Sequence, residues 1–571
     1  MAAALGLGWL ALKEHRVPAT TLSIPAIAFL AAVVVHDRVA GRRARVGRAV
    51  RLYELALARL DGQWDLQPDD GSRFLDPHHP YAADLDLFGP HSLFQLLNTT
   101  RTAPGEATLA RWLTEPARAD EIEARQDAVK ELRPRLDMRE ALWIAGHAVR
   151  ASVDAPQLAA WGVGPPLLPW AGTRPLLFVV ASAISVLGVG WLAGLLPAAP
   201  AALAAAVVLA LTQILHRRTS AVVDAVARPD SHLALLAALA RVFEREREIA
   251  APGLLDHSPK LRDLHERLTV DGQRASRQIA RLSRLVSVLS WQHNLIFTPI
   301  GYALLWRPQL AAAIEAWRRR NGPRVAVWIQ ALAELEALVS LATFSHDHPE
   351  RPFPRMVAPT DGPIFDAESL GHPLLPHCVT NDIRLGGARE LGGPRLMMLS
   401  GSNMSGKSTL MRTVGVNAVL ALAGAPVYAG RLVLSALVPG ATLRVQDSLA
   451  AGTSRFYAEV KRLRQLVDLA RGPTPLLFLV DELLAGTNSH DRRLGALAVL
   501  TGLVKLGAIG IASTHDLALT EVTDELPGQA SNYHFQDELH DGVLTFDYRL
   551  RPGIVQRSNA LALMRAVGLE V

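Results

Sequence analysis

The sequence predicts an α/β domain at the C-terminal end of the chain, an all-α core before it, and helices that can cross a membrane. Three observations lead to this fold class. Short apolar runs alternate with helical patterns after residue 350, and helical periodicity dominates before it. Two stretches, of 19 and 42 residues, contain no Asp, Glu, Lys or Arg.

The composition already limits what the chain can be. Its 571 residues suffice for about three to four domains. Lysine plus arginine (59) exceeds aspartate plus glutamate (54) by only 5, so the charge by itself indicates no nucleic-acid partner. The single cysteine, Cys378, excludes a disulfide framework and a cysteine-based zinc site. Only 20% of the residues are charged, against about 25% in an average soluble chain, so the chain carries an apolar surplus.

Residues 1–40 are predicted to form an N-terminal membrane anchor. The stretch Val17–Val35 is uncharged, and six arginines follow it between residues 38 and 51. Because positive residues mark the cytoplasmic side of a membrane, the chain after Val35 is expected in the cytosol. A signal peptide is the alternative, but its basic residues would precede the apolar stretch. Residues 1–12 are apolar too, and they form either part of an additional span or a short outer tail.

Residues 173–216 are predicted to form a transmembrane hairpin. The charge-free stretch Pro175–His216 is flanked by Arg174 on one side and by Arg217 and Arg218 on the other. A spanning helix needs about 20 apolar residues, so this stretch is long enough for two, with a turn near Leu195–Pro197. The alternative is a pair of buried helices in a soluble core.

Residues 41–172 are predicted to be the first part of a helical core, and residues 217–350 a helical lever region. One lever segment places arginines on one face and apolar residues on the other. This basic face indicates either contacts with phosphates or a solvated surface near anionic lipid. The arginines are Arg274, Arg277, Arg281 and Arg284, opposite Ile279, Leu282, Leu285 and Val286. Four prolines between residues 352 and 363 then predict a linker.

A P-loop lies directly after the apolar run that ends at Ser400 and directly before a helical pattern. Its glycines let backbone N–H groups curl around phosphate oxygens, and the helix N-terminus adds a favourable dipole. We expect Lys407 to reach the β- and γ-phosphates and the Ser408 hydroxyl to bind Mg²⁺. The predicted nucleotide-binding residues here are Gly401, Ser402, Asn403, Met404, Ser405, Gly406, Lys407, Ser408 and Thr409.

Two further strand ends supply the catalytic residues. The apolar run Leu476–Val480 ends in Asp481, a predicted Mg²⁺ ligand together with Ser408, and in Glu482, which we expect to polarise the attacking water. His515 follows another apolar run and is expected to sense a γ-phosphate. The sequence therefore predicts a nucleoside-triphosphate hydrolase.

These motifs together resemble the MutS family of DNA mismatch-repair ATPases. The pair Asn403 and Met404 in the P-loop is distinctive of that family. Asp481–Asn488 resembles its Walker B segment, and Ser513–Asp516 resembles its switch-histidine segment. The resemblance implies an ABC-type P-loop ATPase domain over residues 351–571, with ATP as its nucleotide and Mg²⁺ as its metal.

The resemblance also implies a partner subunit. Asp447–Glu459 resembles the family's signature loop, in which the serine at the position of Ser454 reaches the nucleotide of the opposite subunit. A homodimer through the ATPase domains is therefore expected, with Ser454 among the nucleotide-binding residues. Upstream, Asp86–Phe88, Asn98–Gly105 and Ile122–Val129 resemble the start of the family's core domain.

The departures from the family pattern concern recognition of DNA. Mismatch-reading members carry a Phe-x-Glu wedge, and none of the 14 phenylalanines here begins such a motif. Only about 75 residues precede the core resemblance, and the predicted hairpin interrupts the core. The resemblance therefore implies a membrane-anchored branch of the family, without the recognition domain.

The expected function is that of a multi-pass protein of the cell membrane whose core and ATPase domain face the cytoplasm. Its expected output is ATP-dependent DNA binding by charge and shape, without mismatch specificity. The alternative is a mechanical or scaffolding ATPase that acts at the membrane on a protein or lipid partner.

Overall fold

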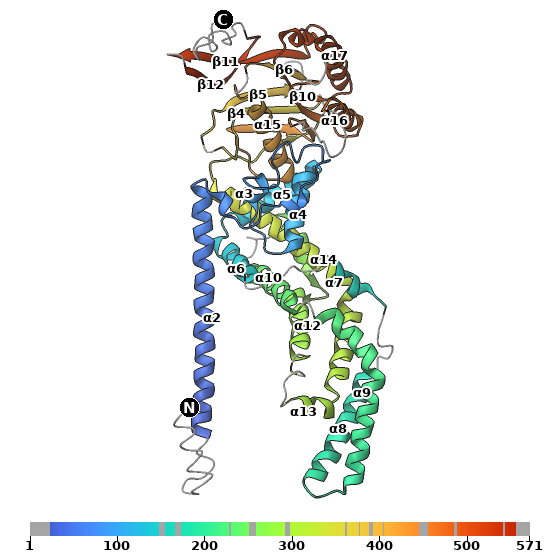
Figure 1. Cartoon of the computed structure of the whole chain (residues 1–571). Coiled ribbons are helices and arrows are strands. Elements are labelled where there is room, and N and C mark those ends of the chain that lie inside the picture. Colours follow the sequence, from blue (N-terminus) through green and yellow to red (C-terminus); the bar gives the residue numbers. More distant parts are fainter. Residues whose placement is uncertain are drawn as a thin grey trace. The chain divides into compact units, whose positions relative to one another are not determined.

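The computed structural model (Figure 1) divides the chain into two compact units, residues 1–61 and 62–571. The residues that it describes are 23–147, 155–165, 173–227, 230–249, 258–289, 291, 297–359, 362–375, 377–387, 392–402, 405–444, 455–484, 488–540 and 543–555. In the first unit the described part is one helix, α2 (Ser23–Leu60). It contains the second half of the predicted N-terminal anchor, and the apolar side chains between Ile27 and Val35 on it are exposed.

The second unit contains most of the predicted helical core, whose first residues, 41–60, belong to α2. The described residues of the core are mainly helical from Leu93 on, whereas residues 62–92 form turns and two short 3₁₀ helices, so the prediction of helix is wrong there. The long helix α14 (Trp306–Asp347) is the central element of the core and packs against α4, α5, α7 and α12. Although α14 is long and apolar enough to cross a membrane, 83% of its most apolar window is buried in the protein. The other helices of this part are α3 (Leu93–Leu97), α4 (Ala103–Thr114), α5 (Ala119–Leu132), α6 (Leu136–His147), α7 (Ala155–Val163), α10 (Asp230–Ile249), α11 (Pro259–Leu268), α12 (Ala275–Leu289) and α13 (Thr298–Ala303). A short hairpin of β1 (Thr269–Val270) and β2 (Gln273–Arg274) precedes α12.

Two close contacts fix α14 in the core. A Cβ atom at Gly322 would lie 2.1 Å from the carbonyl oxygen of Gly162 on α7, so this helix crossing requires glycine. Further along, the buried Glu336 carboxylate accepts hydrogen bonds from the Arg101 backbone N–H (2.8 Å) and the Thr102 hydroxyl. Burial raises the pKa of Glu336 to about 7. These bonds join α14 to the first turn of α4.

The predicted hairpin is present as two antiparallel helices, α8 (Thr173–Leu192) and α9 (Ala198–Ala227), joined by a turn at residues 193–197. The alternative of two buried helices is wrong, because only 17% and 11% of their apolar windows are buried. Both helices have the length and composition to cross a membrane. The helix α9 continues past Arg217 and Arg218 and packs against α14 with its last turns.

The C-terminal part contains the predicted, mostly parallel sheet. Its strand order is β12-β11-β6-β10-β9-β8, and every neighbouring pair is parallel except β11 with β12. The strands are β6 (Leu396–Ser400), β8 (Val438–Thr442), β9 (Leu476–Val480), β10 (Ile509–Thr514), β11 (Ala530–His540) and β12 (Val543–Pro552). The helices α15 (Lys407–Ala423), α16 (Arg455–Ala470) and α17 (Ser489–Lys505) accompany this sheet.

A second sheet was not predicted from the sequence. Its order is β3-β7-β4-β5, with β3 (Arg355–Val357), β4 (Ile364–Leu370), β5 (Asn381–Gly386) and β7 (Arg431–Ser435). The strand β3 lies within the predicted proline-rich linker, where it pairs in parallel with β7. That pairing makes these residues part of the C-terminal domain, which was predicted to begin at residue 351, so a linker is not what residues 355–357 form.

The helical core and the sheets are joined by buried polar contacts. The carboxylate of Asp84 accepts hydrogen bonds from the backbone N–H groups of Leu443 (2.9 Å) and Arg444 (2.8 Å), and from the guanidinium of Arg462. In addition, α15 packs against α4 and α5. The helix that follows the P-loop therefore contacts the same helices that hold α14.

Candidate nucleotide-binding site

Three neighbouring parallel strands end at one edge of the large sheet. In the register of β6 with β10, Ser400 lies opposite Thr514, and in that of β10 with β9, Ala512 lies opposite Val480. The P-loop, the pair Asp481 and Glu482, and His515 follow directly after these strand ends. The structure therefore brings together the three motifs that the sequence predicted to act together.

The P-loop has the compact geometry that a phosphate site requires. Gly401 and Gly406 have φ values of +147° and +100°, and Gly406 caps the N-terminus of α15. A Cβ atom at Gly401 would lie 3.0 Å from the Ser405 hydroxyl oxygen, closer than side chains normally pack. The hydroxyls of Ser402 and Ser405 are buried without a hydrogen-bond partner within the described part of the chain. Asn403 and Met404 lie outside the described residues.

The side chain of Lys407 folds back over the P-loop, where backbone carbonyl groups hold it. Its ammonium group donates hydrogen bonds to the carbonyl oxygens of Gly401 (2.9 Å) and Ser402 (2.7 Å). Burial lowers the pKa of Lys407, while the nearby carboxylates of Asp481 and Glu482 oppose that shift. Among the described residues, the hydrogen bonds of this buried ammonium go to two neutral carbonyl oxygens, which phosphate oxygens can replace.

Asp481 lies at the centre of a small hydroxyl network. One of its oxygens accepts a hydrogen bond from the Ser408 hydroxyl and the other from the Ser513 hydroxyl. The Ser513 oxygen also accepts a hydrogen bond from the Glu482 backbone N–H (3.2 Å). Ser513 thus positions both acidic residues, a role that the sequence did not reveal.

The pair Ser408 and Asp481 fits Mg²⁺ chemically. Magnesium takes hard oxygen ligands, and in nucleotide sites it is held by one or two protein groups plus phosphate oxygens. Within the described residues, no group of three or more His, Cys, Asp or Glu side chains could hold a metal ion. This pair therefore suits a metal that arrives with the nucleotide better than a metal held by protein ligands alone.

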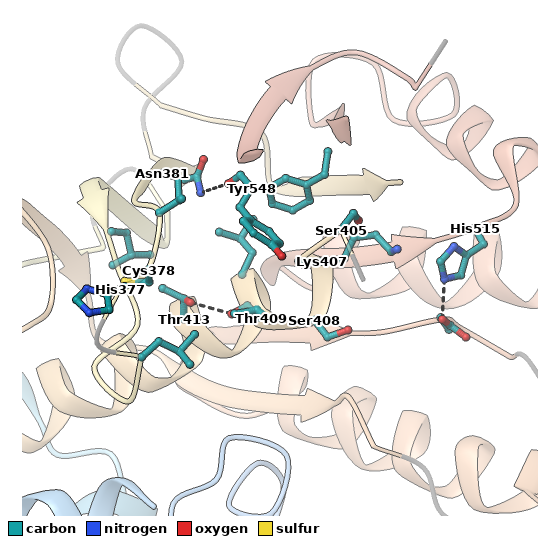
Figure 2. A pocket seen from close by; sticks show the side chains of 17 residues that line it. His377, Cys378, Asn381, Ser405, Lys407, Ser408, Thr409, Thr413, His515 and Tyr548 are labelled. Atoms are coloured by element: carbon teal, nitrogen blue, oxygen red, sulfur yellow. Dashed lines mark hydrogen bonds and ion pairs between the residues drawn. The ribbon is translucent and has the colours of Figure 1, made fainter. Parts of the chain in front are cut away.

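Glu482 and His515 face the same space from two strand ends. The Nε2 atom of His515 lies 2.7 Å from the Oε1 atom of Glu482, and Figure 2 shows this contact beside Lys407. Glu482 has a φ of +49°, which few glutamates adopt and which follows directly on the end of β9. The two side chains are still 44% and 33% exposed, so the reacting end of the site is open in the single chain.

A cavity of about 430 Å³ runs from these residues along the P-loop to a less polar end (Figure 2). Ser405, Lys407, Ser408 and Thr409 line it at the phosphate end, together with Glu482 and His515. The other end is lined by Leu375, His377, Cys378, Val379 and Tyr548. A polar end beside an apolar and aromatic end suits a nucleotide, with its base against the second group.

Tyr548 and Asn381 are site residues that the sequence did not reveal. Asn381 donates a hydrogen bond from its Nδ2 atom to the Tyr548 carbonyl (3.0 Å) and accepts one from the Leu550 N–H (2.8 Å). These bonds hold the ring of Tyr548 over Gly406, where a Cβ atom would lie 3.1 Å from it. No local sequence pattern predicts this contact, because Asn381 and Tyr548 are 167 positions apart. Ser454 lies outside the described residues, directly before α16.

Comparison with known proteins gives two family matches. The model for MutS domain III matches residues 83–342, and the model for MutS domain V matches residues 397–570. The chain is also similar to individual mismatch-repair proteins. It is 32% identical over 269 residues to the DNA mismatch repair protein MutS of Natronomonas pharaonis, a match covering 46% of this chain and 29% of that protein.

Two other relatives give the same result. One is the DNA mismatch repair protein MutS 1 of Halobacterium salinarum, 34% identical over 265 residues, which are 44% of this chain and 29% of the relative. The other is the DNA mismatch repair protein MSH6 of Arabidopsis thaliana, 33% identical over 274 residues, or 45% and 20% of the two chains. The matched part thus spans less than a third of the length of these relatives.

Replacement of Tyr548 tests the base end of the cavity. Tyr548→Ala is expected to weaken ATP binding by about three- to tenfold, because stacking on an aromatic ring contributes about 0.5–1.5 kcal/mol. Tyr548→Phe keeps the ring and should bind ATP like the parent. Calorimetric titration of both proteins with ATP measures this, and equal affinities for the parent and Tyr548→Ala would contradict the assignment.

Proposed function

Because the chain belongs to the MutS family, we propose that it is a Mg²⁺-dependent ATPase that works as a membrane-anchored homodimer. The observation that carries the ATPase proposal is the meeting of three strand ends. There, Lys407, Ser408, Glu482 and His515 line one cavity, and Asp481 accepts a hydrogen bond from Ser408 beside it. This is the set of groups that phosphoryl transfer to water requires.

The residues divide the work of hydrolysis between them. The P-loop N–H groups and Lys407 bind the β- and γ-phosphates, and Ser408 and Asp481 hold Mg²⁺. When bound, the metal neutralises charge that develops on the phosphate oxygens. Glu482 polarises the water that attacks the γ-phosphate, and His515, 2.7 Å away, orients the Glu482 carboxylate.

The dimer proposal rests on the family resemblance of Asp447–Glu459 and on the openness of the site. Glu482 and His515 remain partly exposed in the single chain, although hydrolysis benefits from the exclusion of bulk water. A second subunit that places its Ser454 against the nucleotide would close this side. ATP would then lie at the interface between the two ATPase domains.

The test of the ATPase proposal is Glu482→Gln. Loss of the carboxylate should lower the rate of ATP hydrolysis by about 10²- to 10⁴-fold, the usual contribution of a general base, and leave ATP binding intact. Glu525→Gln, an exposed change in the same domain, serves as the control and should hydrolyse ATP at the parental rate. Phosphate release by the purified chains in detergent measures both.

The same variant also tests the dimer. Since Glu482→Gln should retain ATP, it should accumulate as a nucleotide-bound dimer in size-exclusion chromatography with light scattering. A parental hydrolysis rate would contradict the role of Glu482. A monomer in the presence of Mg²⁺ and ATP would contradict the role of Ser454.

Membrane anchoring is supported by the exposure of the apolar helices. Burial of only 17% and 11% in the apolar windows of α8 and α9 leaves two long apolar surfaces that water solvates poorly. Arg217 and Arg218 at the end of the charge-free part of α9 favour a cytoplasmic position for the core and the ATPase domain. The exposed apolar side chains from Ile27 to Val35 on α2 support a further span in a multi-pass protein of the cell membrane.

Two outputs remain in competition. The first is DNA binding by charge and shape without mismatch specificity, which the family resemblance favours. The second is a mechanical or scaffolding ATPase at the membrane. Arg277, Arg281 and Arg284 on α12 are exposed in the single chain and lie directly before an apolar segment. Basic side chains beside an apolar segment suit anionic lipid headgroups, and this position favours the second output.

DNA titrations separate the two outputs. If the chain binds DNA by charge, matched and mismatched duplexes should bind equally, and affinity should fall steeply with salt, with a log–log slope near −0.9 per phosphate contact. Fluorescence anisotropy with linear, junction and mismatched DNA measures this. Absence of salt-sensitive binding to any of them would contradict the first output and leave the second.

A further inference from the structure

A third charge-free segment lies between α12 and α14. Residues 285–306 contain no Asp, Glu, Lys or Arg over 22 positions, and Arg284 and Arg307 flank them. The sequence assigns this segment to the lever region, because it is interrupted by Pro299 and Gly301 and shows no long apolar helix. In the structure it contains the end of α12, the short helix α13 and the first residue of α14.

The structure places α13 against the hairpin instead of in the helical core. Leu305, which lies between α13 and α14, is buried in a small cluster with Leu177 and Ala181 of α8 and Val208 of α9. Val208 lies nine residues before Arg217, which is about 13 Å along the helix axis. Leu177 lies only three residues after Arg174, about 5 Å along α8. If the arginines that flank the hairpin lie at the headgroups of a bilayer, Leu305 lies in the outer part of its hydrocarbon layer of about 30 Å.

An open apolar groove follows α13 along the hairpin. It has a volume of about 840 Å³, and its lining from α8, α9 and α13 is almost wholly apolar, including Gly188, Ala201, Ala205, Ile300 and Tyr302. Ile300 and Tyr302 are each half exposed. In water, this surface would add to the apolar area that the hairpin already leaves uncovered.

We propose that α13 and its flanking residues, 297–306, enter the bilayer beside the hairpin, and that lipid acyl chains fill the groove between α8, α9 and α13. The inference rests on the membrane anchoring proposed above and adds a second point of contact with the bilayer. Lipid is the occupant because the lining offers almost no polar group to a protein partner, and because the groove is continuous with the lipid-facing surface of the hairpin.

Charged and aromatic residues mark the boundary of this contact. Arg281 and Arg284 are exposed just before the charge-free segment begins. At its other end, Arg307 and His216 line a smaller cavity of about 250 Å³ that shares Tyr302 with the groove. Basic side chains attract anionic headgroups, and tryptophan and tyrosine favour the membrane interface. The exposed Trp291, which packs beside Phe297 and Trp306, fits a position at the membrane interface.

One long helix, α14, connects α13 to the part of the chain that holds the nucleotide site. The chain runs from α13 through Leu305 directly into α14. The opposite end of α14 packs on α4 and α5, which in turn contact α15, the helix that follows the P-loop. Figure 1 shows α14 running between these two ends of the second unit.

Site-specific fluorophores measure the depth of α13 directly. In a Cys378→Ser background, the only native cysteine is removed, and single cysteines are placed at Ile300 or Tyr302 and labelled with an environment-sensitive dye. Val189→Cys on α8 reports the hairpin, and Val327→Cys, an exposed position on α14, reports the aqueous part. The full chain is reconstituted into vesicles of phosphatidylcholine and phosphatidylglycerol that contain a nitroxide on the acyl chain.

The expected result is quenching at positions 300 and 302 at least about half as strong as at 189, with little at 327, because nitroxides in the hydrocarbon layer reach only nearby dyes. Quenching at 189 together with values at 300 and 302 equal to that at 327 would overturn this inference and leave the anchor in place, as would occur if a protein covered the groove. Absence of quenching at all four positions would overturn the anchor itself. Ile300 and Tyr302 are both exposed, so labels there should not disturb folding. Each labelled protein should elute from a size-exclusion column in detergent at the same volume as the parent.

Discussion

The parallel pairing of β6, β9 and β10 is the constraint on which the rest of the site depends. Parallel strands in register end at one edge, so the chain segments that leave them are forced together. Asp481 connects two of these segments, because its carboxylate accepts hydrogen bonds from the hydroxyl of Ser408, which follows β6, and from the hydroxyl of Ser513 on β10. A slip of one residue in either pairing would separate the P-loop from its metal ligand. All five residues of β6 and all five of β9 are buried, so both strands lie in the interior of the domain.

A series of helix contacts connects the nucleotide site to the rest of the second unit. The helix α15 begins in the P-loop and packs on α4 and α5, and these pack on α14. Glu336 joins α14 to α4 through two hydrogen bonds, and the Gly162–Gly322 contact locks α14 against α7. The contacts of α15 with α4 and α5 thus link the nucleotide site to one continuous helix, whose other end meets the hairpin.

The sequence revealed those parts whose chemistry fixes local spacing. The P-loop and the pair Asp481 and Glu482 could be predicted, because phosphate and Mg²⁺ require those residues at those intervals next to strands. The hairpin could be predicted as well, because absence of charge over 42 residues is itself the signal. Asn381 and Tyr548 could not, since their contact depends on the tertiary pairing of distant segments.

Other features were hidden by their surroundings. The strand β3 lies among prolines that read as a linker, and only its pairing with β7 makes it a strand. The segment before α14 is as free of charge as the N-terminal span, but the amphipathic α12 ahead of it suggested a soluble lever. Composition alone does not separate a membrane span from a buried helix. The helix α14 has the composition of a span, but its packing in the core excludes that role.

The most direct test of the central claim is the affinity of Mn²⁺, a paramagnetic substitute for Mg²⁺, in the presence of ATP. If Asp481 and Ser408 complete a metal site with the nucleotide phosphates, the parent chain should bind Mn²⁺ tightly only when ATP is present. Asp481→Asn should weaken that binding by about tenfold or more, in line with the loss of a charged ligand. Equal Mn²⁺ affinities in the two proteins, measured by electron paramagnetic resonance, would contradict the account.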